Sequence, residues 1–233
     1  MVRIVAPRER AAVASLVATS AILRVLAAVP HSTPRLFPDE YIYAELARSL
    51  RHGSLTIRGV PAHFPALLEP ILTAPFWALG NVDEAFRLTQ AMHAIVGSLV
   101  AIPVWLLARR LGLEAWQRVS CVVLALALPT LLYASYLTAD VVAFTLAVSA
   151  IYSAVVALEA PSRRSQATFL ALAGLATFAR VQYVVLVLAF CVAMLAGSGG
   201  RPLLALRRYR LTVACLSVPA VAVLVLGPGH VLG

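Results

Sequence analysis

The stretch VSCVVLALALPTLLYASYLTADVVAFTLAVSAIYSAVVAL, residues 119–158, decides the fold class of this protein, because its forty residues carry a single charge, Asp140. A continuous helix rises ~1.5 Å per residue, so this run would reach ~60 Å, twice the ~30 Å thickness of a bilayer core. The run therefore predicts a helical hairpin that crosses a membrane twice and turns near Asp140.

The rest of the chain repeats this pattern. Residues 165–200 also carry one charge, Arg180, near their middle, and predict a second hairpin. Single spans are predicted at residues 11–30, 88–108 and 211–233, each long enough to cross a bilayer. Because the chain is also 61% hydrophobic and only 12% charged, we predict an all-α, polytopic integral membrane protein with about seven transmembrane helices.

The charges indicate how the chain is oriented. All 19 basic residues are arginines, which favours a bacterial source, and the net charge is +9. The arginines cluster in short breaks between apolar runs and form no continuous basic face, which argues against a nucleic-acid partner. By the positive-inside rule, the N-terminus is predicted to be cytoplasmic and residues 31–84 to form a long extracytoplasmic loop.

This loop holds six of the chain's ten acidic residues and has helical character of its own. Tyr43, Leu46, Ala47 and Leu50 follow the spacing of one helical face, which predicts a helix lying in the membrane interface. The following segment PAHFPALLEPILTAPFWALG, residues 61–80, contains four prolines and predicts a kinked juxtamembrane segment.

Four charged residues are predicted at the extracytoplasmic face: Asp39, Glu40, Asp140 and Arg180. A charge within a membrane segment costs at least ~2.5 kcal/mol at a helix centre, so each is a candidate site residue. Together they could bind an anionic head group, coordinate a cation or move a proton. Structural roles stay open beside these: the acidic residues suit helix N-termini, and the arginine could extend to lipid head groups.

Several short motifs occur in an order that resembles a known family. They are PDEYIYAELARSL, the proline-rich segment, FRLTQAMHAIVGSLVAIPVWLLARRL, LPTLLYASYLTADVVAFTLA and GLATFARVQYVVLVL. The chain resembles, over roughly residues 15–230, the N-terminal module of GT-C class polyprenyl-phosphate-sugar-dependent glycosyltransferases. This group includes protein O-mannosyltransferases and the aminoarabinose transferases that act on lipid A.

The resemblance implies roles for the same four residues. Asp39 matches the acidic residue of the first loop, expected to be the general base, and Glu40 matches the second acidic residue of the pair. Arg180 falls where a basic residue binds the donor phosphate, and Asp140 where a supporting acidic residue begins the fourth span, although the family commonly has Glu there. A divalent metal held by Asp39, Asp140 and the phosphate is an open alternative.

The resemblance thus implies an inverting transfer of sugar from a polyprenyl-phosphate donor to an extracytoplasmic acceptor of the cell envelope. We expect a single transmembrane module over residues 1–233. The resembling enzymes usually continue into further spans, so this chain is expected to be a fragment, a minimal module that needs a partner subunit, or an inactive remnant. Two alternatives remain: a transporter or lipid flippase with an intramembrane Asp140–Arg180 pair, and a membrane subunit without chemistry.

Overall fold

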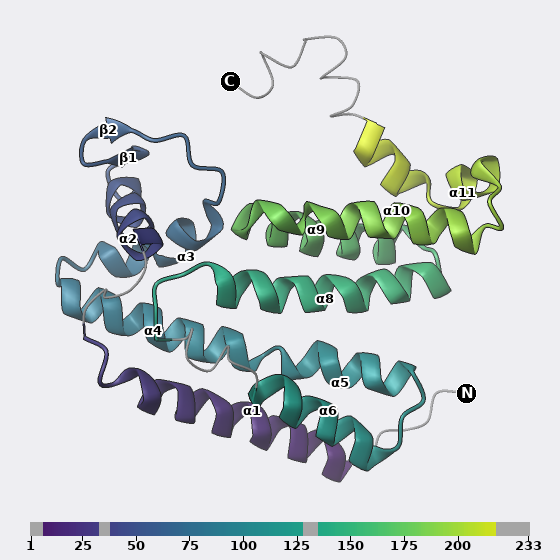
Figure 1. Ribbon diagram of the computed structural model, residues 1–233, viewed down its shortest axis with the longest axis horizontal. Helices are drawn as coiled ribbons and strands as arrows, with labels where there is room; N and C mark the ends of the chain where they lie inside the picture. Colours follow the sequence, from purple (N-terminus) through teal and green to yellow (C-terminus); the bar gives the residue numbers. More distant parts are fainter. Residues whose placement is uncertain (1–6, 33–37, 128–134, 218–233) are drawn as a thin grey trace.

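Helices running back and forth between two ends account for most of the structure, a computed structural model that describes residues 7–32, 38–127 and 135–217 (Figure 1). In chain order the described elements are α1 (Pro7–Ala28), α2 (Pro38–Leu50), β1 (Thr56–Ile57), β2 (Val60–Pro61), α3 (Leu68–Trp77), α4 (Val82–Ser98), α5 (Ala101–Arg110), α6 (Ala115–Ala127), α8 (Asp140–Glu159), α9 (Arg163–Ala179), the 3-10 helix η1 (Val181–Val184), α10 (Val185–Gly197) and α11 (Pro202–Arg208). Residues 210–217 are also helical. The mostly helical fold is therefore confirmed.

Three segments are long and apolar enough to cross a membrane: α1, the 29-residue segment Val82–Arg110 that α4 and α5 form together, and α8. A fourth is reached if the bent pair Val181–Gly197 and Pro202–Arg208 is counted as one span. The described part of α6 has 13 residues, or ~20 Å of helix, which is short of a bilayer core.

The described residues are therefore compatible with a membrane location and support three or four spans. The count of seven crossings and the orientation stay predictions. The last predicted span, residues 211–233, lies largely outside the described residues.

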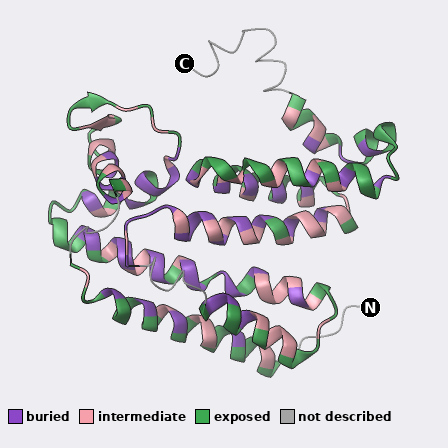
Figure 2. Cartoon of the chain, viewed as in Figure 1, coloured by how far each residue is buried: buried purple, intermediate pink, exposed green. Residues whose placement is uncertain are grey.

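α8 is the central helix of the bundle. Among its 20 residues only Ile151 and Glu159 are exposed, and it packs on α4, α5, α9 and α10. Figure 2 shows the resulting contrast with α1 and α10, which keep many exposed positions. α8 is apolar around its whole circumference, as expected of a helix in a protein core or a membrane span, and here protein neighbours cover it.

The predicted hairpin over residues 165–200 is present, with Arg180 at its turn. α9 ends at Ala179, and Arg180 adopts an extended conformation before η1 and α10 reverse the chain. Phe169 of α9 stacks on Phe190 of α10 with ring centroids 4.2 Å apart, and Tyr209 meets Phe190 edge-on. These rings are the centre of an apolar core that joins α8, α9 and α10.

The predicted loop forms a compact region between α1 and α4. One face of α2 is buried, with Tyr43, Leu46 and Ala47 on it. The helix packs on α3, so this face contacts other parts of the protein. The sequence predicted that α2 lies in the membrane interface, where its apolar face would contact lipid; in the structure this face contacts protein instead. The proline-rich segment forms α3, with Pro75 inside the helix.

One short β-hairpin departs from the all-α prediction. Thr56 pairs with Pro61 and Ile57 with Val60, so that Arg58 and Gly59 form a two-residue turn. Both turn residues have positive φ, 52° and 79°, as a type I′ turn requires. Gly59 adopts positive φ without steric cost and so allows the turn. The sequence did not predict the hairpin because strands of two residues are too short to show hydrophobic periodicity.

Arg24 is fully buried in the middle of α1. Its guanidinium donates to Ser20 Oγ at 3.2 Å and to the carbonyl oxygen of Leu126 at 3.2 Å, near the described end of α6. A buried guanidinium needs such acceptors, because its loss of hydration would otherwise be uncompensated. Arg24 therefore holds α1 against α6, instead of extending to lipid head groups.

Gly97 lets α1, α4 and α8 approach one another. A Cβ at this position would lie 3.0 Å from Val141 and 3.4 Å from the Arg24 guanidinium, both of which are buried. Gly174 on α9 is a matched contrast, since a Cβ there would have no neighbour within 4 Å.

We predict that Gly97→Ala lowers the free energy of unfolding by about 1–3 kcal/mol, because the added methyl overpacks a crowded contact. Gly174→Ala should leave it unchanged or raise it by up to about 1 kcal/mol, since alanine favours helix. Thermal unfolding in detergent, followed by circular dichroism, measures both. Equal changes in the free energy of unfolding for the two variants would contradict the close contact at Gly97.

Candidate functional site

Three of the four predicted site residues meet at one end of the bundle. Arg180 donates through Nη2 to Asp140 Oδ2 at 2.6 Å, and the same nitrogen lies 3.6 Å from Asp39 Oδ2. The residues come from α2, α8 and the end of α9, which are separated by up to 141 positions in the chain. The sequence had placed them on one side of a membrane; the fold brings them into contact.

Helix ends position all three charges. Asp39 lies in the first turn of α2, Asp140 is the first residue of α8, and Arg180 follows the last residue of α9. Helix dipoles favour negative charge at N-termini and positive charge at C-termini, so each charge is at the end that stabilises it. The three residues can therefore stabilise helix ends, as the sequence allowed, and also belong to one charged cluster.

The cluster is open to ligands. The side chains of Asp39, Asp140 and Arg180 are 42%, 38% and 25% exposed. Ion pairs this exposed contribute little to stability, typically about 0–1 kcal/mol. Arg180 Nε is buried without a hydrogen-bond acceptor within the described segments. A guanidinium has five N–H donors, and the hydrogen bond to Asp140 uses one of them, through Nη2. Chemically, the cluster can accept a proton through a carboxylate and bind a phosphate through the guanidinium.

Tyr43 lies near the cluster and is buried. Its side chain is 2% exposed, and its ring meets Phe64 edge-on at 5.6 Å between centroids. Burial raises the pKa of the Tyr43 hydroxyl to about 12, partly opposed by the positive charge of Arg180 and assisted by Asp39 and Asp140. The phenol therefore stays protonated at neutral pH and remains a hydrogen-bond donor beside the acidic groups.

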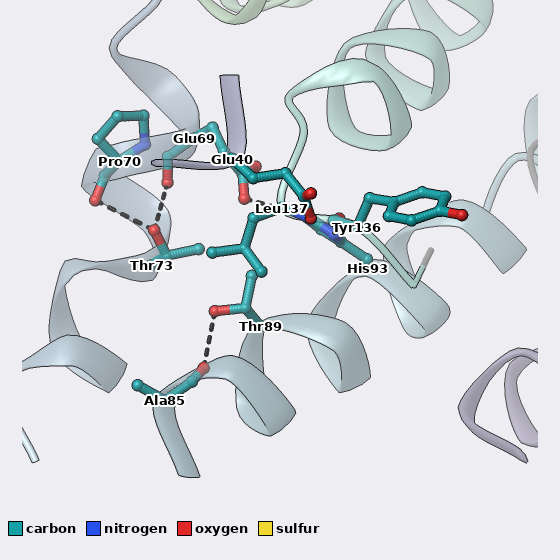
Figure 3. Close-up of polar contacts among 9 residues, drawn as sticks. All are labelled: Glu40, Glu69, Pro70, Thr73, Ala85, Thr89, His93, Tyr136 and Leu137. Carbon is teal, nitrogen blue, oxygen red and sulfur yellow. Dashed lines mark hydrogen bonds and ion pairs between the residues drawn. The ribbon is translucent and has the colours of Figure 1, made fainter. Parts of the chain in front are cut away.

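Glu40 points away from this open cluster. It is fully buried, and its Oε1 accepts a hydrogen bond from the Leu137 backbone N–H at 3.1 Å (Figure 3). The two adjacent carboxylates therefore have different surroundings: Asp39 faces an accessible cluster and Glu40 holds the protein backbone.

This contact is one of three that hold the segment leading into α8. Gln90 Nε2 donates to the Ser135 carbonyl at 2.9 Å, and His93 Nδ1 lies 3.0 Å from the Tyr136 carbonyl oxygen. Residues 135, 136 and 137 are thus each held by one side chain, two from α4 and Glu40 from α2. We call these three contacts the backbone clamp. It fixes where α8 begins and hence where Asp140 stands.

His93 also makes a buried contact that sequence reasoning missed. Its Nε2 lies 2.7 Å from Glu69 Oε1, with the two side chains 0% and 1% exposed (Figure 3). A carbonyl oxygen only accepts, so Nδ1 carries the proton donated to Tyr136. The Nε2–Oε1 contact then shares one further proton, as imidazolium with carboxylate or as neutral imidazole with carboxylic acid. Glu69 Oε2 is buried without a hydrogen-bond partner within the described segments.

A sequence signal for these residues exists. Gln90 and His93 lie three positions apart in a predicted span that carries no charge, and polar side chains there face the protein interior. Glu69 is the only acidic residue of the proline-rich segment. Nothing in the sequence pairs the two, because their contact depends on how α3 packs on α4.

The residues do not fit a metal site of the protein's own. No group of three or more histidine, cysteine, aspartate or glutamate side chains arranged to hold an ion occurs within residues 7–32, 38–127 and 135–217. Asp39 and Asp140 both face Arg180 Nη2, so the position between the carboxylates already receives a positive charge. No role of the cluster below depends on a metal.

Comparison of the chain with protein-family models, with curated proteins and with solved structures found no match.

We predict that His93→Ala lowers the free energy of unfolding by about 3 kcal/mol or more, because it removes a clamp contact and leaves the Glu69 carboxyl buried without its partner. His63→Ala, at an exposed position of the same loop region, should change it by less than about 0.5 kcal/mol. Denaturant titration in detergent micelles measures the difference. Equal stability of the two variants would show that the clamp contributes nothing.

Proposed function

We propose that this chain is a membrane glycosyltransferase module that transfers a sugar from a polyprenyl-phosphate donor to an extracytoplasmic hydroxyl acceptor. The observation that supports this most directly is the contact of Asp39 with Arg180, 3.6 Å apart in an accessible cluster at one end of the bundle. A transfer of this type needs a base for the acceptor and a cation for the leaving phosphate within a few ångströms of one another.

In this mechanism Asp39 accepts the proton of the acceptor hydroxyl as the acceptor oxygen attacks the anomeric carbon. The bond between that carbon and the phosphate oxygen breaks, its electron pair stays on the polyprenyl phosphate, and the sugar configuration is inverted. Arg180 stabilises the charge that develops on the departing phosphate, which is where a guanidinium with spare N–H donors contributes most. The donor phosphate then competes with Asp39 and Asp140 for the same guanidinium.

Asp140 and Glu40 have supporting roles in this proposal. Asp140 holds the Arg180 guanidinium at 2.6 Å and so orients its remaining N–H groups. Glu40 was expected beside Asp39 in the chemistry, but its burial and its bond to Leu137 favour a positioning role through the backbone clamp. Tyr43, a buried and protonated phenol near the cluster, adds no negative charge to it.

One observation also favours the transporter alternative. Asp140 and Arg180 do form an ion pair, as a transporter with an intramembrane pair would need. This pair, however, lies where α8 begins and α9 ends, together with the loop residue Asp39. Transporter sites lie near the bilayer midplane, where discontinuous helices meet. A cluster at the helix ends therefore suits an enzyme better.

The donor part of the proposal predicts selective loss of polyprenyl-phosphate binding. Arg180→Ala should weaken binding at least about tenfold, since hydrogen bonds to a charged phosphate contribute more than neutral ones. Asp39→Asn should bind at least as tightly as the wild type, because the change removes a carboxylate that competes with the phosphate for Arg180. Native mass spectrometry of the protein in nanodiscs containing polyprenyl phosphate measures the bound fraction.

The matched control is Arg48→Ala. Arg48 lies on α2 and pairs with Glu45 at 3.3 Å, and both side chains are substantially exposed, so its loss should leave binding unchanged. Equal retention of polyprenyl phosphate by Arg180→Ala and by the control would contradict the donor site.

The chemical part predicts a separate effect. Asp39→Asn should lower sugar transfer by about 10²–10⁴-fold, the usual contribution of a general base. Asp83→Asn, an exposed acidic position in the first turn of α4, should not. Incorporation of labelled sugar from a panel of polyprenyl-phosphate donors into cell-envelope acceptors measures both. Transfer by Asp39→Asn at the wild-type rate would rule out Asp39 as the base.

A further inference from the structure

A second charged site lies at the opposite end of the bundle. Figure 1 shows α11 and the start of α9 at the end of the bundle away from α2 and α3. Between them is a pocket of about 470 Å³. Its lining residues are Pro161, Ser162, Arg163, Gln166, Arg207, Arg208, Arg210 and Leu211.

The four pocket arginines have no acidic partners. All are exposed, and none of the ion pairs in the described part of the chain includes them. The ten acidic residues of the sequence all fall within the described ranges, so no Asp or Glu side chain pairs with these arginines. Glu159, which ends α8 nearby in the sequence, pairs with Arg110 instead. Four guanidinium groups around one cavity repel one another unless an anion is bound.

Buried contacts hold the pocket in shape. Gln166, 3% exposed, donates through Nε2 to the Arg208 carbonyl at 3.3 Å. Its Oε1 accepts from the backbone N–H and the hydroxyl of Thr212, both at 3.2 Å. Tyr209, between two of the arginines, is 3% exposed and packs on Phe190. The arginines after α11 are thereby fixed relative to Arg163 at the start of α9, whose helix dipole adds positive potential.

The surroundings indicate that the anion belongs to a lipid. α11 follows α10 at an angle of 115°, so it runs across the bundle instead of continuing it. Leu203, Leu204 and Leu206 on α11 are 74%, 49% and 43% exposed. Exposed leucines beside a row of arginines, on a helix that crosses the bundle axis, are typical of a segment lying in a membrane interface. The arginine distribution predicts this end to be cytoplasmic.

We propose that this pocket binds the phosphate head group of an anionic phospholipid of the cytoplasmic leaflet, with the α11 leucines in the acyl-chain region beside it. Arginine forks match phosphate oxygens in pairs, and four of them form a binding site for one phosphodiester or for a head group with an additional phosphate. This inference is independent of the proposed transferase chemistry, which concerns the other end of the bundle.

The test compares two variants of equal charge. Arg163→Gln with Arg210→Gln removes two pocket arginines. Arg164→Gln with Arg201→Gln removes two exposed arginines at the same end that do not line the pocket. Each protein is placed in detergent with phosphatidylglycerol or with phosphatidylcholine, and bound lipid is counted by native mass spectrometry.

We expect the wild type and the control to retain one phosphatidylglycerol in preference to phosphatidylcholine, and the pocket variant to bind it at least about tenfold more weakly. No preference for phosphatidylglycerol in the wild type, or equal loss in both variants, would overturn the proposal. Displacement of the lipid by millimolar inorganic phosphate would also overturn it, since the pocket would then be a site for soluble phosphate.

A charge-preserving variant guards against loss of folding. Arg163→Lys with Arg210→Lys keeps the charge but loses the paired N–H geometry, and should bind phosphatidylglycerol with intermediate affinity. Circular dichroism confirms that each variant is folded before binding is compared. Full binding by a folded Arg163→Gln, Arg210→Gln variant would contradict the site.

Discussion

The backbone clamp on residues 135–137 is the contact on which the remaining arrangement depends. Glu40, Gln90 and His93 each hold one residue of this segment, and all three side chains are almost completely buried. In such surroundings an unmade hydrogen bond costs the full desolvation of its donor or acceptor, so loss of any one of the three contacts is destabilising. The clamp joins the loop region, α4 and the start of α8 into one unit.

Two consequences follow from the position of α8. Its N-terminus presents Asp140 to Arg180, and the same geometry brings Asp39 from the loop region within reach. Its body, apolar on all sides, becomes the helix around which α4, α5, α9 and α10 pack. The candidate site and the core of the fold therefore share one helix, because α8 forms the core and carries Asp140 at its N-terminus.

The two ends of the bundle differ in charge and so in chemistry. At one end, acidic and basic groups meet in a half-exposed cluster that suits proton transfer and phosphate binding in the same place. At the other, four arginines surround a pocket without any carboxylate. The proposed phospholipid head group would supply an anion to the second end, whereas at the first end two carboxylates face one guanidinium.

The sequence by itself determined the helical class, the hairpin at Arg180 and the helical face of α2. These follow from local properties: apolar length, 3.6-residue periodicity and the cost of charge in an apolar run. It also predicted Asp39, Asp140 and Arg180 on one side of a membrane, and the three residues do meet at one end of the bundle. The number of membrane crossings was not determined, since α6, α9 and α10 are each shorter than a bilayer span in their described parts.

Only the tertiary structure decided which of two adjacent carboxylates is accessible and which neighbours each meets. Asp39 and Glu40 differ by one position, about 100° around a helix, and that rotation sends one to the cluster and the other to the clamp. The Glu69–His93 pair and the contact of Arg24 with the end of α6 likewise join residues 24 and 102 positions apart. Such contacts depend on how the helices pack, so local patterns in the sequence do not predict them.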